Sequence, residues 1–188
     1  MNLYDIIMSP LETLILHDIR SEIIPLAQDN VLEVGIGTGA NITYYDYSKI
    51  SSLTGLDCKY SPELERHAGK KIHFSPGIIE KMPFATDSFD CVVATLILCT
   101  VDLEKSLQEI KRILKPGGMF IFIEHVRPSG KLAGAVFDAL NKVWPRMAHG
   151  CNLNRETDVE LGKSGFSNIH IKKKYNGIFC YGSAQNEV

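Results

Sequence analysis

The sequence predicts one α/β domain with a mostly parallel central sheet. Apolar runs of strand length alternate with segments whose apolar residues recur at helical spacing. The first run, residues 31–34, leads directly into Gly35, Gly37 and Gly39. Glycines lack the Cβ atoms that keep a ligand away from the backbone, and a strand that turns into a helix presents amide N–H groups at one point. This stretch is therefore predicted to hold a small ligand with a negative or polar end at the carboxyl edge of the sheet.

Length and composition are those of an ordinary globular domain. The chain has 188 residues, which suits one sizeable core, and hydrophobic residues make up 45% of it. Its net charge of −2 offers no general attraction for nucleic acid. The longest apolar runs, residues 91–101 and 119–123, are too short to span a bilayer, and we expect neither a signal peptide nor an integral membrane segment.

Five cysteines are scattered along the chain, without a CxxC pair and without the spacing typical of metal ligands: Cys58, Cys91, Cys99, Cys151 and Cys180. An odd number of thiols within apolar runs indicates reduced cysteines. The sequence thus predicts a cytoplasmic protein with no metal site. Cys99 and Cys151 are predicted to be buried apolar residues rather than nucleophiles.

The N-terminal residues 3–24 carry apolar residues at helical spacing and are predicted to form one or two helices. Pro10 can begin a second helix, and Pro25 ends the segment. A helix packed on the domain is the favoured interpretation. The alternatives are a lid over the ligand, formed by residues 1–25, and weak peripheral contact with a membrane, although the segment lacks the basic residues of membrane-surface helices.

A helix over residues 41–47 and a strand over residues 51–56 are predicted after the glycines. The strand ends at Asp57, which follows the glycines at about the spacing of the acid that holds a ribose in nucleotide sites. Asp57 is therefore predicted to bind ribose hydroxyls. Ser61 and Pro62 begin the next helix as its N-cap and first residue.

The remaining strands are predicted at residues 71–74, 91–95, 119–124, 166–173 and 176–183. Asp102 is predicted to cap a helix that extends to Lys115. Residues 127–165 are the least regular part of the chain and the predicted substrate side, with short helices near 131–144 and 155–163.

Three stretches carry a resemblance to a known superfamily. Glu33 stands two positions before the three glycines. Residues 77–90 closely resemble the pattern Gly-Asp-Ala-Glu-x-Leu-Pro-Phe-x-x-x-Ser-Phe-Asp, and residues 114–119 form a helix-to-strand turn. In this order they resemble the class I S-adenosylmethionine (SAM)-dependent methyltransferases that act on small molecules. The resemblance implies SAM as cofactor and a Rossmann-like three-layer sandwich, whose seven-stranded, mostly parallel sheet has an antiparallel last strand and the order 3-2-1-4-5-7-6.

Within this superfamily, residues 95–101, 124–126 and 150–157 resemble the methyltransferase-like thiol S-methyltransferases. This implies transfer of the SAM methyl group to a small-molecule acceptor such as a thiol. The alternatives are N-methylation of an amine or phospholipid headgroup, a SAM-binding module without catalysis, and an NAD-dependent reductase. The chain lacks the catalytic Tyr/Lys pattern of the reductases. It also lacks the Asn/Asp-Pro-Pro-Tyr sequence of nucleic-acid amino methyltransferases. We expect a small-molecule partner, no nucleic acid, and a monomer or homodimer.

Eight residues match the family's cofactor positions: Glu33, Gly35, Gly37, Gly39, Asp57, Ile78, Ile79 and Leu96. The resemblance implies that Ile78 and Ile79 line the adenine pocket. Ile78 replaces the family's aspartate, so apolar contact takes the place of a side-chain hydrogen bond, and a plain core role is the alternative. Glu33 is expected to receive the methionine ammonium of SAM, to orient the loop, or to be a strand acid bonded to nearby amides.

Fewer residues are candidates for contact with the methyl acceptor. His125 ends the fifth predicted strand and is a candidate base or substrate contact, with a structural role as the alternative. Glu124 alternates with it and is expected to face the other side of the sheet. Asn152 and Arg155 can hold a polar substrate or cap the following helix, for which Asn154 is better placed.

Overall fold

A computed structural model describes residues 15–67, 69–70, 72–148 and 150–187. Most of the predicted N-terminal helix, including its restart at Pro10, lies outside the described residues, as does most of the predicted lid over residues 1–25. Within the described part of the chain, no helix is both long enough and apolar enough to cross a membrane.

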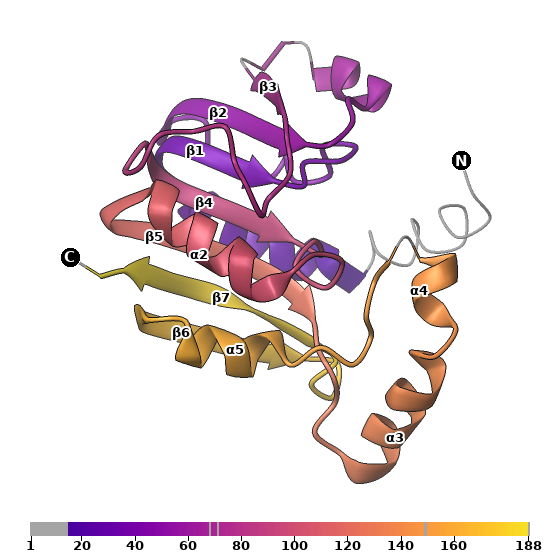
Figure 1. Ribbon diagram of the computed structural model, residues 1–188. Coiled ribbons are helices and arrows are strands. Elements are labelled where there is room, and N and C mark those ends of the chain that lie inside the picture. The colour runs from indigo at the N-terminus through magenta and orange to yellow at the C-terminus, as the bar shows by residue number, and fades with distance from the viewer. Residues whose placement is uncertain (1–14, 68, 71, 149, 188) are drawn as a thin grey trace.

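Seven strands form one sheet in the order β3-β2-β1-β4-β5-β7-β6 (Figure 1). Six strands run in the same direction, and β7 is antiparallel to both of its neighbours. The predicted order and the reversed last strand are therefore confirmed. The bounds are β1 (Asp29–Val34), β2 (Ile50–Asp57), β3 (Ile72–Pro76), β4 (Phe89–Thr95), β5 (Leu114–His125), β6 (Phe166–Lys174) and β7 (Phe179–Asn186).

Helices cover both faces of the sheet and complete three layers. Residues 15–23 are helical and continue into η1 (Ile24–Leu26); Leu16 and Ile19 are fully buried against Val31 on one face. The other face is covered by α2 (Leu103–Ile113) and α5 (Thr157–Lys163), which lie in front of the sheet in Figure 1. Leu32 and Phe122 pack on that side. Because side chains alternate along a strand, one sequence supplies both cores.

Helix α2 begins as the sequence predicts. The Asp102 carboxylate accepts a hydrogen bond from the backbone N–H of Lys105 at 3.3 Å, which satisfies one amide of the first turn. The helix after Ser61 is a short 3-10 helix, η2 (Pro62–His67). The prediction of Asn154 as a cap is wrong, because α5 begins at Thr157 and Glu156 occupies the N-cap position without a side-chain bond.

The predicted helix over residues 41–47 is also wrong, since this segment folds as consecutive turns. The amide of Ile42 donates to Gly39 and that of Tyr44 donates to Asn41, both in three-residue steps. The Asn41 side chain is drawn inward by hydrogen bonds with Glu33, Thr95 and Arg20. Such side-chain hydrogen bonds compete with the backbone hydrogen bonds of a regular helix, and no regular helix forms in this segment.

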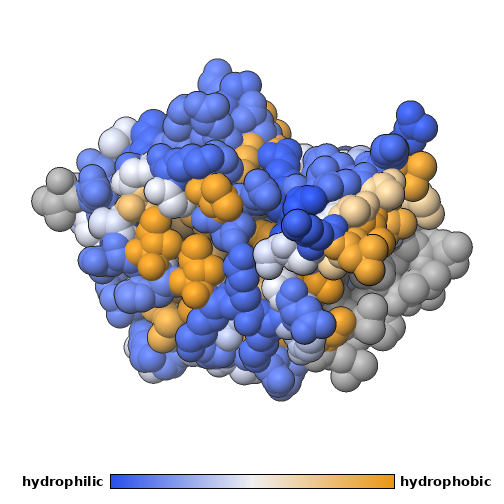
Figure 2. Space-filling model, turned by 90° about the horizontal axis from the view of Figure 1, so that it is seen from below, coloured by the Kyte–Doolittle hydropathy of each residue, from blue (hydrophilic) through white to orange (hydrophobic). Residues whose placement is uncertain are grey.

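Helices α3 (Lys131–Leu140) and α4 (Trp144–Met147) lie beyond the carboxyl ends of the parallel strands (Figure 1). Arg127, just after β5, holds α3 through a bidentate pair with Asp138, with N···O distances of 3.0 and 2.8 Å. Figure 2 views the molecule from below and shows hydrophobic atoms gathered on parts of this surface. Five apolar side chains of this segment are exposed. They are Leu132, Val136, Leu140, Val143 and Met147.

The pairing of β7 with β6 leaves no room for a side chain at Gly182, where a Cβ would overlap the backbone carbonyl of His170. We expect Gly182→Ala to lower the free energy of unfolding by on the order of 3 kcal/mol, measured by urea denaturation. Gly162→Ala in α5 is the matched control, since nothing lies within 4 Å of its new methyl group. That control should gain up to about 1 kcal/mol. Equal changes in the free energy of unfolding for the two variants would contradict the pairing register of β6 and β7.

Candidate active site

The glycine loop that follows β1 has a shape only glycines adopt easily. Gly35, Gly37 and Gly39 have φ angles of 69°, 50° and 80°, all in the left-handed region. A Cβ on Gly35 would lie 2.7 Å from the Ile97 side chain. At Gly37 the nearest atom is 3.9 Å away, so a methyl group there would point into open space. Gly35 therefore lets the loop reach the segment after β4, and Gly37 borders an open volume.

Four amides of this loop are already hydrogen-bonded, which corrects the prediction that the loop presents bare amide N–H groups at a helix start. Three amides, those of Gly35, Ile36 and Gly39, donate to backbone carbonyls of the loop or of β2. The Gly37 amide donates to the Asp57 carboxylate at 3.0 Å. The loop is thus fixed in its conformation by internal hydrogen bonds, and a ligand would meet a preformed surface.

A cavity of about 170 Å³ opens at the carboxyl ends of β1 and β2. It brings together four of the predicted cofactor residues: Gly35, Asp57, Ile78 and Ile79. Sequence reasoning missed the opposite wall, formed by Ile97, Thr100 and Val101 after β4. The available signal was their place just beyond a predicted central strand, where parallel sheets bind ligands.

The neighbouring residues Ile78 and Ile79 have different environments. Ile78 is 54% exposed although it is apolar, whereas Ile79 is 4% exposed and packs in the core with Met82. An exposed isoleucine at a cavity wall offers a surface for a flat apolar ring, and its neighbour anchors it. The core alternative therefore describes Ile79, and Ile78 has the geometry of a binding residue.

Four predicted cofactor residues do not line the cavity: Glu33, Gly37, Gly39 and Leu96. Leu96 follows β4 directly and has a φ of 54°, a strained value for a leucine, and its amide donates to the carbonyl of Ile123 at 2.8 Å. The turn at Leu96 redirects the chain, so that the next residue, Ile97, faces Gly35.

Glu33 is buried at 3% exposure and has both carboxylate oxygens in hydrogen bonds. It accepts from Asn41 at 3.0 Å and from the Tyr45 hydroxyl at 2.7 Å, and Arg20 bonds the other end of Asn41. Burial raises the pKa of Glu33 to about 7, although these hydrogen bonds and the charge of Arg20 act in the opposite direction. Glu33 thus ties the turns after the glycine loop to β1.

Glu124 holds the segment after β4. One oxygen, Oε1, accepts from the amides of Ile97 and Leu98 at 3.0 and 2.9 Å. The side chain is fully buried, and its other oxygen has no hydrogen-bond partner among the described residues. Burial raises the pKa of Glu124 to about 7, because desolvation disfavours the charged form. Glu124 packs with the core on the α2 side of β5, and the alternation of the strand puts His125 on the other side.

His125, Cys99 and Cys151 meet at the carboxyl end of the sheet. His125 Nε2 lies 2.9 Å from Cys151 Sγ, and the three candidate ligand atoms lie within 4.8 Å of one another. Hydrogen bonds from the Cys99 thiol and from His125 lower the pKa of the Cys151 thiol well below its usual range. Both cysteines are buried among apolar side chains, as predicted, and the Cys151 thiol also meets His125.

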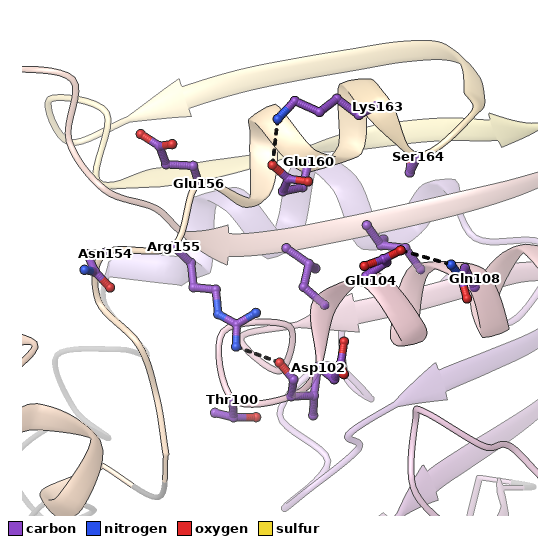
Figure 3. A pocket seen from close by; sticks show the side chains of 13 residues that line it. Thr100, Asp102, Glu104, Gln108, Asn154, Arg155, Glu156, Glu160, Lys163 and Ser164 are labelled. Atoms are coloured by element: carbon purple, nitrogen blue, oxygen red, sulfur yellow. Dashed lines mark hydrogen bonds and ion pairs between the residues drawn. The ribbon is translucent and has the colours of Figure 1, made fainter.

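A larger groove of about 1000 Å³ lies between α2 and α5 (Figure 3). Its lining is mostly polar and includes Asn154 and Arg155. Arg155 donates to the carbonyl of Val101 at 2.7 Å, and Asn152 donates to that of Cys99 at 3.1 Å. Both side chains thus brace the segment after β4. Neither the glycine loop nor Asp57 lines this groove, so the predicted cofactor residues gather in the smaller cavity.

Comparison with known proteins agrees with this geometry. Residues 32–122 match the family described as a methyltransferase domain. These residues resemble the class I SAM-dependent methyltransferases. This match confirms the resemblance that the motif order predicts and supports SAM as the cofactor.

Two relatives are thiol S-methyltransferases. The chain is 35% identical over 150 residues to thiol S-methyltransferase TMT1B of Rattus norvegicus, covering 76% of this chain and 62% of the relative. It is 34% identical over 160 residues to thiol S-methyltransferase TMT1A of Homo sapiens, covering 79% and 64%. The chain thus spans less than two thirds of the length of these relatives.

A solved structure shares the fold. Phosphoethanolamine N-methyltransferase 2 of Haemonchus contortus, in complex with S-adenosyl-L-methionine, superposes with a TM-score of 0.70 at 16% identity. The match covers 91% of this chain and 53% of that one. At this identity the likeness establishes the arrangement of strands and helices and leaves the acceptor open.

The raised pKa of Glu33 predicts a pH dependence of stability. The folded state binds this proton more tightly than the unfolded chain, so its contribution to the free energy of unfolding falls as pH rises from about 4.5 to about 7. Over that interval the native chain should lose on the order of 2–3 kcal/mol more than Glu33→Gln in urea titrations. Glu65→Gln, at an exposed position, should follow the native chain. Parallel curves for the native chain and Glu33→Gln would contradict this assignment.

Proposed function

We propose that this chain is a SAM-dependent methyltransferase that transfers the methyl group to the sulfur of a small-molecule thiol. The observation that carries the proposal is the cavity in which the glycine loop, the acid at the tip of β2 and the segment after β4 converge. The methyltransferase domain supports the reaction class. The acceptor class is supported by the names of the relatives at about 35% identity.

We propose that the nucleoside of SAM lies between Asp57 and Ile78. Asp57 sits at the tip of the second strand, where its carboxylate can exchange the Gly37 amide for ribose hydroxyls. The exposed face of Ile78 suits the adenine ring, and Ile79 holds it in place. The amino-acid tail then runs over the glycine loop, where Gly37 borders open space.

In this proposal Glu33 and Leu96 shape the site without contacting SAM. Glu33 orients the turns after the loop through Asn41 and Tyr45 rather than receiving the SAM ammonium, because it is buried and does not line the cavity. Leu96 redirects the chain so that Ile97 closes the cavity. The site residues that touch the cofactor are therefore fewer than the family pattern implies.

Methyl transfer from SAM requires little chemical activation by the protein. The sulfonium of SAM makes its methyl carbon electrophilic, so the enzyme must hold a nucleophile in line at about 3–3.5 Å and exclude water. A thiol with a pKa near 8.5 is partly ionised at neutral pH. His125, at the end of β5, is the proposed base or acceptor contact. The predicted cytoplasmic location, the monomer or homodimer and the possibility of peripheral membrane contact stay predictions.

The acceptor is tested by incubating the purified chain with SAM labelled in its methyl group and with matched panels of thiols and amines. We expect label to appear in thiols. Label in amines alone would favour N-methylation, and binding of S-adenosylhomocysteine without transfer to either panel would favour a module without catalysis. Both results would contradict the proposed reaction.

Gly37→Ala isolates the role of the open space beside the loop. We expect the affinity for S-adenosylhomocysteine, measured by calorimetry, to fall at least about tenfold, because the new methyl group occupies the ligand's volume. Gly117→Ala is the control, since Gly117 also has a positive φ and has no atom within 4 Å of a new methyl group. Both variants should lose about 1 kcal/mol of stability. Equal affinities in the two variants would place the cofactor elsewhere.

A further inference from the structure

Cys99, His125 and Cys151 come from three separate elements and converge on one point. Cys99 follows β4, His125 ends β5 and Cys151 lies between α4 and α5. Their ligand atoms all lie within 4.8 Å of one another. We propose that these three side chains bind a single zinc ion and leave its fourth coordination position open.

The distances suit a tetrahedral ion after a small adjustment. Zinc bonds of about 2.3 Å to sulfur and 2.0–2.1 Å to nitrogen place neighbouring ligand atoms about 3.5–3.8 Å apart. The His125 Nε2 to Cys151 Sγ distance of 2.9 Å must therefore widen by about 0.6 Å, which side-chain rotation can supply. Binding releases the proton of each thiol, so two thiolates balance the charge of Zn²⁺ and the neutral imidazole completes the set.

The backbone around the ligands is held in place. The Asn152 side chain donates to the carbonyls of Cys99 and Gly150 at 3.1 and 2.9 Å, and the Asn152 amide donates to the same Cys99 carbonyl at 3.0 Å. These bonds join the two loops that carry the thiols. Glu124 fixes the two amides before Cys99. A ligand set supported in this way is preorganised, which lowers the ordering cost of binding a metal.

The ligand types select a soft ion. Two sulfurs and one imidazole nitrogen favour zinc over magnesium or calcium, which prefer carboxylate and carbonyl oxygens. Apolar contacts with Ala148, Trp144 and Leu153 surround the two cysteines and limit water. Three protein ligands with an open fourth position are typical of catalytic rather than structural zinc sites.

The open position gives the ion a role in the reaction; this step rests on the proposed function. Cys99 stands two residues after Ile97, which lines the proposed cofactor cavity. A thiol acceptor bound to zinc would release its proton to solvent and become the nucleophile, and His125 would then serve as a zinc ligand in place of the base. The acceptor sulfur then forms the bond to the methyl carbon, and the electron pair of the broken bond passes to the sulfonium, which becomes the neutral sulfur of S-adenosylhomocysteine.

Cobalt titration of the full chain tests the metal site directly. The protein is stripped with a chelator, kept reduced with a phosphine, and titrated with Co²⁺, whose tetrahedral thiolate complexes absorb in the near-ultraviolet and visible. We expect one equivalent of cobalt to produce both bands and one equivalent of Zn²⁺ to abolish them. Cys99→Ser, Cys151→Ser and His125→Gln should each weaken binding at least about a hundredfold. Cys91→Ala, which removes a buried thiol from the middle of β4, should bind normally.

Two results would overturn the site. One is a folded, reduced chain that gives no stoichiometric charge-transfer band, and the other is normal cobalt binding by both cysteine variants. His125→Gln keeps both buried thiols, so it still tests the site if the cysteine variants fail to fold. Circular dichroism checks folding, and zinc should raise the melting temperature of the native chain but not that of this variant.

Calorimetry with S-adenosylhomocysteine separates this inference from the proposed function. Cobalt binding without nucleoside binding would leave the zinc site standing and contradict the proposed methyltransferase. Nucleoside binding with equal thiol methylation by stripped and zinc-loaded protein would contradict the role of zinc alone. We expect stripping to lower the turnover with thiols at least tenfold and to leave the nucleoside affinity unchanged within about twofold.

Discussion

The hydrogen bonds that the amides of Ile97 and Leu98 donate to the Glu124 carboxylate connect the two halves of the site. Ile97 closes the cofactor cavity against Gly35, and Cys99 begins the cluster with His125 and Cys151. A fully buried carboxyl group is costly to the fold unless it is neutral or well bonded. Glu124, near the end of β5, is such a group. Its side chain positions the segment after β4, which borders both the cofactor cavity and the cluster of Cys99, His125 and Cys151.

The glycine loop contributes shape more than free hydrogen-bond donors. Its amides at positions 35, 36, 37 and 39 are bonded to β2, to the loop itself or to Asp57, and these bonds fix its conformation without a ligand. Gly35 allows close approach of Ile97, and Gly37 leaves space beside the loop. Only the Gly37 bond to Asp57 involves a side chain at the cavity, and it is the bond that a ribose would compete for.

The Asp102 cap and the gathering of Gly35 and Asp57 follow from local patterns, because capping chemistry and the edge rule of parallel sheets act over short stretches. The strand order and the place of Ile78 are predicted by the family resemblance instead. The turns at residues 41–47 follow from neither, since the inward bonds of Asn41 come from distant elements. The cysteine cluster is hidden for the same reason: Cys151 is 26 residues from His125, and no linear spacing marks their contact.

A crystal structure of the chain with S-adenosylhomocysteine tests the central claim that the segment held by Glu124 forms one wall of the cofactor site. The account predicts the ribose at Asp57, the adenine against Ile78, and the sulfur beyond Ile97 toward His125. A nucleoside bound in the groove between α2 and α5, or one whose ribose makes no contact with Asp57, would contradict it.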